Sequence, residues 1–269
     1  MTLTQFARRV LPTPVKRAIV NLGFRMRSRG FRPYVKHKTV EGETFDFWVG
    51  DPDGQKWYDL HTSDPLWVEM RFVRDHIVSP GDVVLECGAH HGCTAILLSR
   101  WVGSSGKVVC FEPMPANVEI IRKNIALNQL QNVTLVPAAV GESEGTVTID
   151  ASSNAAVKNS RHGIHVPQTF VDAYASWNPT VLKIDVEGFE HHVLRGATKV
   201  LATRPKIALE LHPEHLSQYG SSMDEIMAML RPLGYRMWLQ RDDSAEPIEY
   251  DGVAPITTRA HLFCKWGRL

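Results

Sequence analysis

Residues 83–92 read VVLECGAHHG. A mostly apolar run over 83–87 is followed by a short segment that begins at Gly88 and ends at Gly92. A short segment this rich in valine and leucine predicts a strand that is covered on both faces. Gly88 and Gly92 permit a tight turn into a helix over 93–102, whose N-terminus then faces the turn. A glycine pair alone also fits a plain strand-to-helix turn, so the neighbouring residues decide whether a ligand binds there.

The same alternation of strands and helices continues along the chain. Helices are expected over 115–127 and 189–202, and another near Ser222, which forms a capping-box pair with Glu225. This pattern predicts a doubly wound α/β domain with a mainly parallel sheet. Residues 145–150 are expected to add a strand, and 151–168 to form an inserted loop. The strands expected in the sheet span 83–87, 107–112, 133–137, 181–186, 206–211, 235–240 and 261–266.

The first forty residues differ from the rest in charge. Residues 1–40 hold ten Lys or Arg and no acid, whereas the rest of the chain holds 20 basic and 29 acidic residues. Thr13-Pro14 predicts the start of a basic amphipathic helix. Such a helix is expected either to dock on the α/β domain or to contact an anionic membrane surface or an acidic partner. Its apolar stripe consists of Val15, Ile19, Leu22 and Met26.

The chain is expected to divide after residue 60. Residues 1–60 would form the basic helical extension and a short hairpin over 40–60 with Asp53-Gly54 as its turn, and 61–269 the α/β domain. A helical stripe, which ends at Ser79-Pro80-Gly81, precedes the first strand of that domain. Its members are Leu66, Met70, Val73 and Ile77.

Composition places the chain among ordinary globular proteins. It has 269 residues, of which 43% are hydrophobic and 22% charged, and its longest apolar runs are too short to span a bilayer. Basic residues and prolines interrupt the first thirty residues, unlike a signal peptide. The four cysteines lack CxxC spacing, so we expect reduced, buried thiols and a cytoplasmic location, with peripheral membrane attachment as the alternative. The chain has no nucleic-acid-binding motif, and no such partner is expected.

Two carboxylates beside the glycine turn indicate which ligand it would hold. Glu112 ends the second strand, where a carboxylate accepts hydrogen bonds from both ribose hydroxyls. Glu86 lies two residues before Gly88, where it suits a cationic ammonium and sulfonium but repels a pyrophosphate. The turn also lacks the third glycine of the dinucleotide fingerprint. These features favour S-adenosylmethionine, whose product is S-adenosylhomocysteine, over a nicotinamide dinucleotide.

Four runs between residues 81 and 213 resemble the FkbM family of methyltransferases. In chain order they read VVLECGAHHGCTA, VVCFEPMPANVEIIRKNIALN, VLKIDVEGFEHHVLRGA and IALELHP. The chain departs from the family at His90-His91, where the family usually has Asn and an apolar residue. The resemblance implies a Rossmann-like class I fold of seven strands, with the last strand antiparallel between the fifth and sixth. It also implies methyl transfer, usually to oxygen, on small molecules, sugars or natural-product intermediates.

The resemblance also implies which residues border the cofactor. Glu112 would hold the ribose, and Pro113 would help to shape the adenosine pocket. Ala138 and Ala139, after the third strand, would flank the adenine. The methionine part of the cofactor would be bordered by Glu86, Gly88, Ala89, His90 and Gly92.

Charged residues at the ends of the fourth and fifth strands are the candidates for catalysis. Asp185 and His212 would lie across the cofactor's methyl group. In one hypothesis, which we favour, His212 is a general base that Asp185 orients. In another, Asp185, Glu210 and His212 bind a divalent cation. A buried ion-pair network, with Lys183 as the cation, is the purely structural alternative.

The sequence therefore favours an S-adenosylmethionine-dependent O-methyltransferase with a small-molecule acceptor. A nicotinamide-dependent oxidoreductase and a non-enzymatic module that docks on a membrane or protein are the alternatives. Methylation of DNA or of amide nitrogen is rejected, because the fourth strand ends in Asp185-Val186-Glu187-Gly188 and not in an Asn/Asp-Pro-Pro-aromatic motif.

Overall fold

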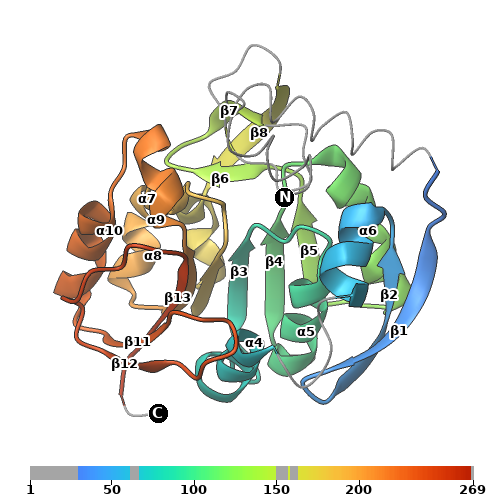
Figure 1. Ribbon diagram of the computed structural model, residues 1–269, viewed down its shortest axis with the longest axis horizontal. Coiled ribbons are helices and arrows are strands. Elements are labelled where there is room, and N and C mark those ends of the chain that lie inside the picture. Colours follow the sequence, from blue (N-terminus) through green and yellow to red (C-terminus); the bar gives the residue numbers. More distant parts are fainter. Residues whose placement is uncertain (1–29, 61–66, 150–156, 158–162, 268–269) are drawn as a thin grey trace, which may run out of the picture.

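The structure, a computed structural model, describes residues 30–60, 67–149, 157 and 163–267. A large twisted sheet crosses the middle of the molecule, with helices on both of its faces (Figure 1). The order of its strands along the sheet is β5, β4, β3, β9, β10, β13, β11 and β12. In chain order they span Val83–Cys87 (β3), Lys107–Phe111 (β4), Val133–Val136 (β5), Val181–Ile184 (β9), Lys206–Leu211 (β10), Arg236–Gln240 (β11), Ile248–Tyr250 (β12) and Ala260–Lys265 (β13).

This topology confirms the doubly wound fold that the sequence predicts. The first five strands in chain order run parallel, and β13 pairs antiparallel with both β10 and β11. The seven expected strands are all present, and β12 adds an eighth at the edge by pairing with β11. The carboxyl ends of the parallel strands therefore meet along one edge, where an open α/β sheet binds its ligands.

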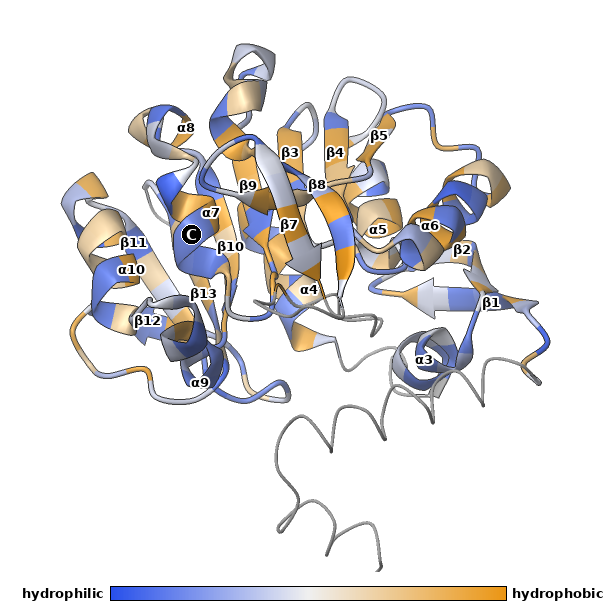
Figure 2. Ribbon diagram, turned by 90° about the horizontal axis from the view of Figure 1, so that it is seen from above, coloured by the Kyte–Doolittle hydropathy of each residue, from blue (hydrophilic) through white to orange (hydrophobic). Residues whose placement is uncertain are grey.

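Alternate residues of each strand enter two different cores. In β3, Leu85 packs with the core that covers one face, whereas Val84 packs with the core on the other face. Figure 2 shows these apolar strands enclosed between the helices. The first face is covered by Val171–Trp177, α7 (Glu190–Arg195), α8 (Thr198–Ala202), α9 (Pro213–Leu216), Ser217–Tyr219, α10 (Met223–Leu230) and Arg231–Leu233. The second is covered by α4 (Val68–Phe72), Val73–Ile77, α5 (Cys93–Val102) and α6 (Pro115–Leu127).

A hairpin precedes this domain, but its turn is not where the sequence analysis placed it. Strands β1 (Tyr34–Val40) and β2 (Glu43–Val49) pair antiparallel and turn at 41–42. Asp53-Gly54 lies instead in the short helix α3 (Pro52–Gln55), because the Asp51 side chain accepts the Gly54 N–H and caps a helical turn that continues into Lys56–Leu60. The hairpin buries Phe45 and Phe47 in the second core. The predicted division at residue 60 stays a prediction.

The segment expected as an inserted loop is partly a strand. Strands β6 (Ala139–Gly141), β7 (Gly145–Ile149) and β8 (Ile164–Phe170) form a separate three-stranded sheet. The expected strand at 145–150 is therefore confirmed, but residues 164–168 belong to β8. They can pair because β7 offers a free edge whose register joins Ile149 to Ile164.

Several smaller expectations are confirmed. Ser222 caps α10 and bonds with Glu225, and the stripe of Met70, Val73 and Ile77 is buried. All four cysteines are buried and free. The basic helix that is expected to begin at residue 13 lies outside the described residues, and so does Leu66. Within the described part of the chain, no helix is long and apolar enough to cross a membrane.

Candidate active site

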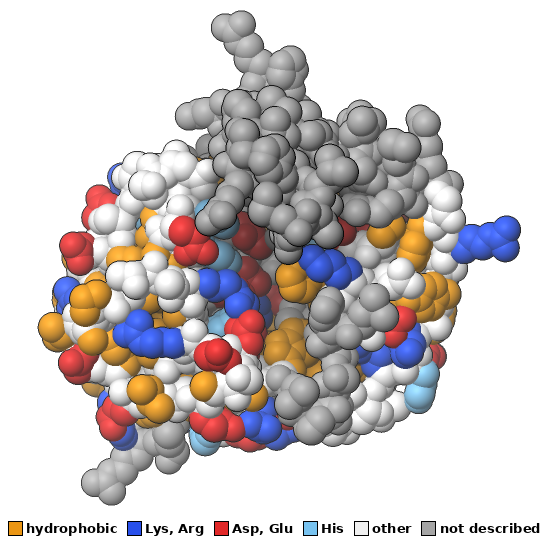
Figure 3. All heavy atoms as spheres, in the orientation of Figure 1, with side chains coloured by type: hydrophobic (Ala, Val, Ile, Leu, Met, Phe, Trp, Pro, Cys, Tyr) orange, Lys and Arg blue, Asp and Glu red, His pale blue; other side chains and the backbone are white. Residues whose placement is uncertain are grey.

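A cavity of about 620 Å³ opens at the carboxyl ends of the central strands. In Figure 3 acidic side chains gather in the hollow at the centre of this face. Its lining includes six of the residues that the sequence singles out: Gly88, Ala89, His90, Glu112, Asp185 and His212. The structure thus brings the predicted cofactor loop and the predicted catalytic residues to one cavity.

The turn after β3 is built for close approach of the backbone. The N–H groups of Gly88 and Ala89 both donate to the Phe111 carbonyl, which fastens the turn to β4. Gly88 has a φ of +92°, and a Cβ there would lie 1.8 Å from the Asp185 carbonyl oxygen. Only glycine fits this position. Gly92, with a φ of +81°, starts α5 and does not line the cavity.

Glu112 is the best-placed carboxylate on the cofactor side of the cavity. It is 3% exposed, and it accepts hydrogen bonds from the His90 N–H, the Met114 N–H and the Asn117 side chain. Burial raises the pKa of Glu112 to about 8, although these three donors oppose the shift. Glu112 therefore lies at the end of β4 with a fixed orientation, as its predicted ribose-binding role requires.

Beside Glu112, a second cavity of about 50 Å³ brings together the residues predicted at the adenosine. Pro113, Ala138 and Ala139 line it, along with Val140 and Phe189. Gly88, Glu112 and Asp185 line both cavities, so the two adjoin. The apolar walls of the small cavity suit a flat heterocycle.

Glu86 lies behind the cavity wall. It is fully buried, accepts a hydrogen bond from Thr94, and burial raises its pKa. Thr94 lines the large cavity and Glu86 does not. In the sheet Glu86 is paired in register with Lys183, whose pKa is lowered by burial but raised more by Glu69, Asp185 and other carboxylates. The predicted contact of Glu86 with the cofactor ammonium stays a prediction.

His90 is held by an aromatic residue from the N-terminal segment. Its Nδ1 lies 2.7 Å from the Tyr58 hydroxyl, and its ring stacks on His91 with centroids 4.0 Å apart. Burial and the neighbouring His91 lower the pKa of His90 well below its usual value. His90 is therefore neutral at physiological pH and has a fixed orientation beside the turn.

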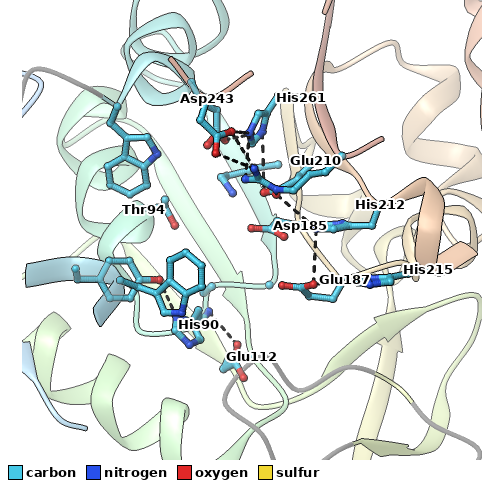
Figure 4. Close-up of a pocket in the computed structure, with 18 of the residues that line it drawn as sticks. His90, Thr94, Glu112, Asp185, Glu187, Glu210, His212, His215, Asp243 and His261 are labelled. Carbon is cyan, nitrogen blue, oxygen red and sulfur yellow. Dashed lines mark hydrogen bonds and ion pairs between the residues drawn. The ribbon is translucent and has the colours of Figure 1, made fainter. Parts of the chain in front are cut away.

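Two carboxylates and one imidazole converge after β9 and β10, as Figure 4 shows. Asp185, Glu187 and His212 each offer a ligand atom, and these atoms lie within 4.8 Å of one another. His212 Nδ1 lies 2.7 Å from Oε1 of Glu190, a fully buried residue of α7. His212 Nε2 lies 3.7 Å from Glu187 Oε2 and 3.4 Å from Glu210 Oε1. These neighbours surround the imidazole with carboxylates.

The carboxylates set the charge of His212. Burial alone would lower its pKa, but hydrogen bonds to Glu190 and Glu210 raise it to about 11. The imidazole in this cluster therefore holds its proton at neutral pH. Either sequence-based role of His212, general base or metal ligand, requires the loss of this proton.

Glu210 belongs to a neighbouring ion-pair network. Arg259 donates to both Glu210 and Asp243, and His261 Nε2 lies 3.3 Å from Asp243 Oδ1. Burial would raise the pKa of Glu210, but His212, His261 and Arg259 lower it far more. Glu210 is thus neutralised by a guanidinium, which makes it a poorer cation ligand than Glu187.

Sequence reasoning missed much of the cavity wall. Trp57, Tyr58, Trp67 and Glu69 come from the segment before β3, and Asp243, Arg259 and His261 come from the end of the chain. Neither group forms a motif with the central strands, because tertiary packing alone brings them to the site. Glu187 and Glu190 belong to the run after the fourth strand. The sequence indicates them only by the unusual number of charged residues that follow a buried strand.

Comparison with known proteins gives a match that spans the glycine turn and the ends of the central strands. Residues 86–237 match the methyltransferase FkbM domain. The hexuronic acid methyltransferase AglP of Haloferax volcanii is 28% identical over 141 residues, which make up 49% of this chain and 56% of that protein. The chain thus spans little more than half the length of this curated relative.

Solved structures with a similar arrangement are more distant. One is the methyltransferase FkbM from Methylobacillus flagellatus KT, with a TM-score of 0.48 and 19% identity over 70% of this chain and 44% of that chain. Another is M. jannaschii TYW2 in complex with AdoMet, with a TM-score of 0.48 and 15% identity over 88% of this chain and 87% of that chain. Similarity at this level supports no conclusion about the site. The family match, in contrast, covers more than half of the 269 residues and includes the glycine turn, Glu112 and the Asp185 cluster, so the chain belongs to the FkbM methyltransferase domain family.

Proposed function

We propose that this protein is an S-adenosylmethionine-dependent O-methyltransferase that acts on a small polyhydroxyl acceptor such as a sugar. The observation that carries the proposal is the meeting of two cavities. The small cavity and the large cavity share Gly88, Glu112 and Asp185 as lining residues. A cofactor with the edge of its adenine in the first would extend into the second and present its methyl group to an acceptor there.

The residues around the shared wall fit this cofactor. Gly88 leaves room that a side chain would fill, and Glu112 lines both cavities with its carboxylate fixed by three donors. Pro113, Ala138 and Ala139 would enclose the adenine. S-adenosylmethionine supplies a methyl group that is already activated, so the protein has mainly to align the acceptor and exclude water.

The wall of the large cavity suits a sugar. Trp57, Tyr58 and Trp67 supply aromatic faces, against which the C–H face of a sugar ring packs. Carboxylates and histidines line the same cavity and accept or donate hydrogen bonds to hydroxyls. A hydroxyl gives up its proton when it is methylated, and the carboxylates of Asp185 and Glu187 lie where such a hydroxyl would enter.

The charge of the cavity favours a neutral sugar over a sugar acid. Its basic lining residues other than histidine are Lys183, which lies among carboxylates that raise its pKa, and Arg259, which is ion-paired with Glu210 and Asp243. In the cavity without a bound metal cation, a uronic acid, the acceptor class in the name of the archaeal relative, would meet repulsion. The acidic lining residues are Glu69, Glu112, Asp185, Glu187, Glu210, Glu214 and Asp243.

The test is transfer of a labelled methyl group from S-adenosylmethionine to methyl glucoside and to two glycosides that each differ from it at one carbon, methyl glucuronide at C6 and methyl glucosaminide at C2. We expect transfer to the neutral glucoside and at least about tenfold less to the glucuronide, which corresponds to about 1.4 kcal/mol of charge repulsion. Glu112→Gln should reduce transfer to all three, because the cofactor binds less well. Equal or better transfer to the glucuronide contradicts the neutral acceptor, and no transfer to any of the three contradicts the sugar assignment.

A further inference from the structure

The cluster after β9 and β10 has the donors and the geometry of a cation site. Asp185 and Glu187 supply carboxylate oxygens and His212 an imidazole nitrogen, all within 4.8 Å of one another. The residues come from the ends of two neighbouring strands, one of which is followed by the left-handed turn at Glu187 (φ 55°) that directs its side chain back toward His212. Figure 4 shows the three side by side at the edge of the cavity.

A buried carboxylate behind the histidine orients it toward this cluster. Glu190 is fully buried, and its Oε1 lies 2.7 Å from His212 Nδ1 and accepts the Gly188 N–H at 2.8 Å. The ring, itself only 4% exposed, therefore turns its Nε2 toward Glu210 at 3.4 Å and Glu187 at 3.7 Å. Histidines that ligate metals are held in this way, with a carboxylate on the nitrogen that does not bind the metal.

Charge gives an independent reason for a cation. Within the part of the chain that the structure describes, no hydrogen bond or ion pair is formed by the Asp185 carboxylate. Its acidic neighbours are Glu187 and Glu210, which Lys183 and His212 offset only in part, and Arg259 is ion-paired with Glu210 and Asp243. Carboxylates this close repel one another unless positive charge lies between them, and a divalent cation on Nε2 would replace the single proton of His212 with two positive charges.

We propose that Asp185, Glu187 and His212 bind a divalent cation of the Mn²⁺ type, with the remaining positions taken by water or by hydroxyl oxygens of the acceptor. Two hard oxygens and one imidazole nitrogen suit Mn²⁺ better than soft cations. The set differs from the one expected from sequence, because Glu187 replaces Glu210. The cation would neutralise the cluster and hold the acceptor's hydroxyls beside Asp185. This second role rests on the proposed methyl transfer, whereas binding of the cation does not.

The experiment is a titration of the metal-free full chain with Mn²⁺ alone, in which electron paramagnetic resonance reports the free cation. We expect one saturable site per chain and an increase in the unfolding temperature with Mn²⁺. Asp185→Asn, Glu187→Gln and His212→Asn should each weaken binding by more than about tenfold, and Glu190→Gln by about tenfold. Glu214→Gln is the matched control, since it removes a carboxylate of the same cavity that lies outside the set.

The outcomes separate this proposal from the proposed function. Absence of Mn²⁺ binding by the unmodified chain overturns the site whatever the variants do, and so does binding that all three ligand variants retain. A loss with Glu210→Gln but not with Glu187→Gln overturns the assigned ligand set. S-adenosylhomocysteine binding is measured on the same metal-free protein. If it is retained while Mn²⁺ does not bind, only the cation proposal fails.

Discussion

Gly88 and Asp185 approach so closely that a side-chain carbon on Gly88 would lie 1.8 Å from the Asp185 carbonyl oxygen. The two residues follow β3 and β9, which are neighbours in the sheet. The turn that would hold the cofactor and the strand end that carries the acidic cluster therefore depend on each other. Any residue larger than glycine at position 88 must push them apart.

Gly88→Ala should damage both the fold and the cofactor site. The added methyl group clashes with backbone, and the φ of +92° strains any L side chain. We expect a loss of about 2 kcal/mol or more in the free energy of unfolding, measured by chemical denaturation, and loss of S-adenosylhomocysteine binding. Gly145→Ala is the control, because nothing lies within 4 Å of that position. Unchanged binding by Gly88→Ala would disprove the close approach.

Glu112 should make the stability of the ligand-free protein depend on pH. Its pKa is raised to about 8 from an ordinary value of 4.5, so the folded state holds a proton that the unfolded state releases. The stabilisation is fully present below about pH 4.5 and is lost as the pH rises to about 8. The unfolding temperature should therefore fall more steeply between pH 5 and pH 9 for the natural protein than for Glu112→Gln. Parallel curves would contradict the buried, protonated carboxyl.

The same group should control cofactor affinity. An ionised Glu112 accepts hydrogen bonds from two ribose hydroxyls, whereas a protonated one accepts them poorly. Between pH 7 and 9 its ionised fraction rises about tenfold, so S-adenosylhomocysteine should bind about tenfold tighter at pH 9, as measured by isothermal titration calorimetry. Glu112→Gln lacks the part of the pH dependence that comes from Glu112. Comparison of the two proteins therefore separates titration of Glu112 from titration of the ligand. Equal pH dependence in the two proteins would count against the ribose contact.

Lys183→Met should destabilise the protein strongly. Lys183 is 4% exposed among the carboxylates of Glu69, Glu86 and Asp185. Removing a buried cation leaves these charges unpaired, at a cost of about 3–5 kcal/mol in urea denaturation. Adding Glu86→Gln should recover part of the loss, whereas the exposed control Lys199→Met should change stability by less than about 0.5 kcal/mol. A small effect of Lys183→Met would show that water reaches Lys183 and the carboxylates around it.

The basic segment gives a prediction from sequence alone. With ten Lys or Arg and no acid in residues 1–40, it should bind anionic liposomes at low salt if its role is membrane attachment. Replacing Lys16, Arg17, Arg25 and Arg27 by Gln should abolish sedimentation with the liposomes and leave S-adenosylhomocysteine binding intact. Neutral liposomes are the control. Failure of the natural protein to bind anionic liposomes would favour docking on the catalytic domain.

The sheet was predictable because burial on both faces leaves a dense local pattern. Each of the seven strands expected from apolar runs is present, and the glycine turn lies where the sequence places it. The hairpin turn was misplaced because Asp53-Gly54 is a common hairpin dipeptide, and the capping by Asp51 that makes it helical is visible only in three dimensions. Residues 164–168 read as a loop because His165, Pro167 and Gln168 interrupt the apolar pattern of an edge strand.

The cofactor side of the site was more predictable than the acceptor side. Gly88, Glu112 and Pro113 follow consecutive strands, so strand order alone brings them together. Tyr58 and Arg259 reach the cavity from opposite ends of the chain, and no spacing rule connects them. The choice between Glu187 and Glu210 as a ligand depends on Arg259. This residue precedes β13 and donates a hydrogen bond to Glu210 in β10.

The central claim, that the glycine turn and Glu112 hold S-adenosylmethionine, is tested most directly by isothermal titration calorimetry of the full chain with S-adenosylhomocysteine and, separately, with NADH. The account predicts one saturable site for S-adenosylhomocysteine, weakened at least about tenfold in Glu112→Gln, and no binding of NADH, whose pyrophosphate would face the acidic cavity. Binding of NADH without binding of S-adenosylhomocysteine would contradict it.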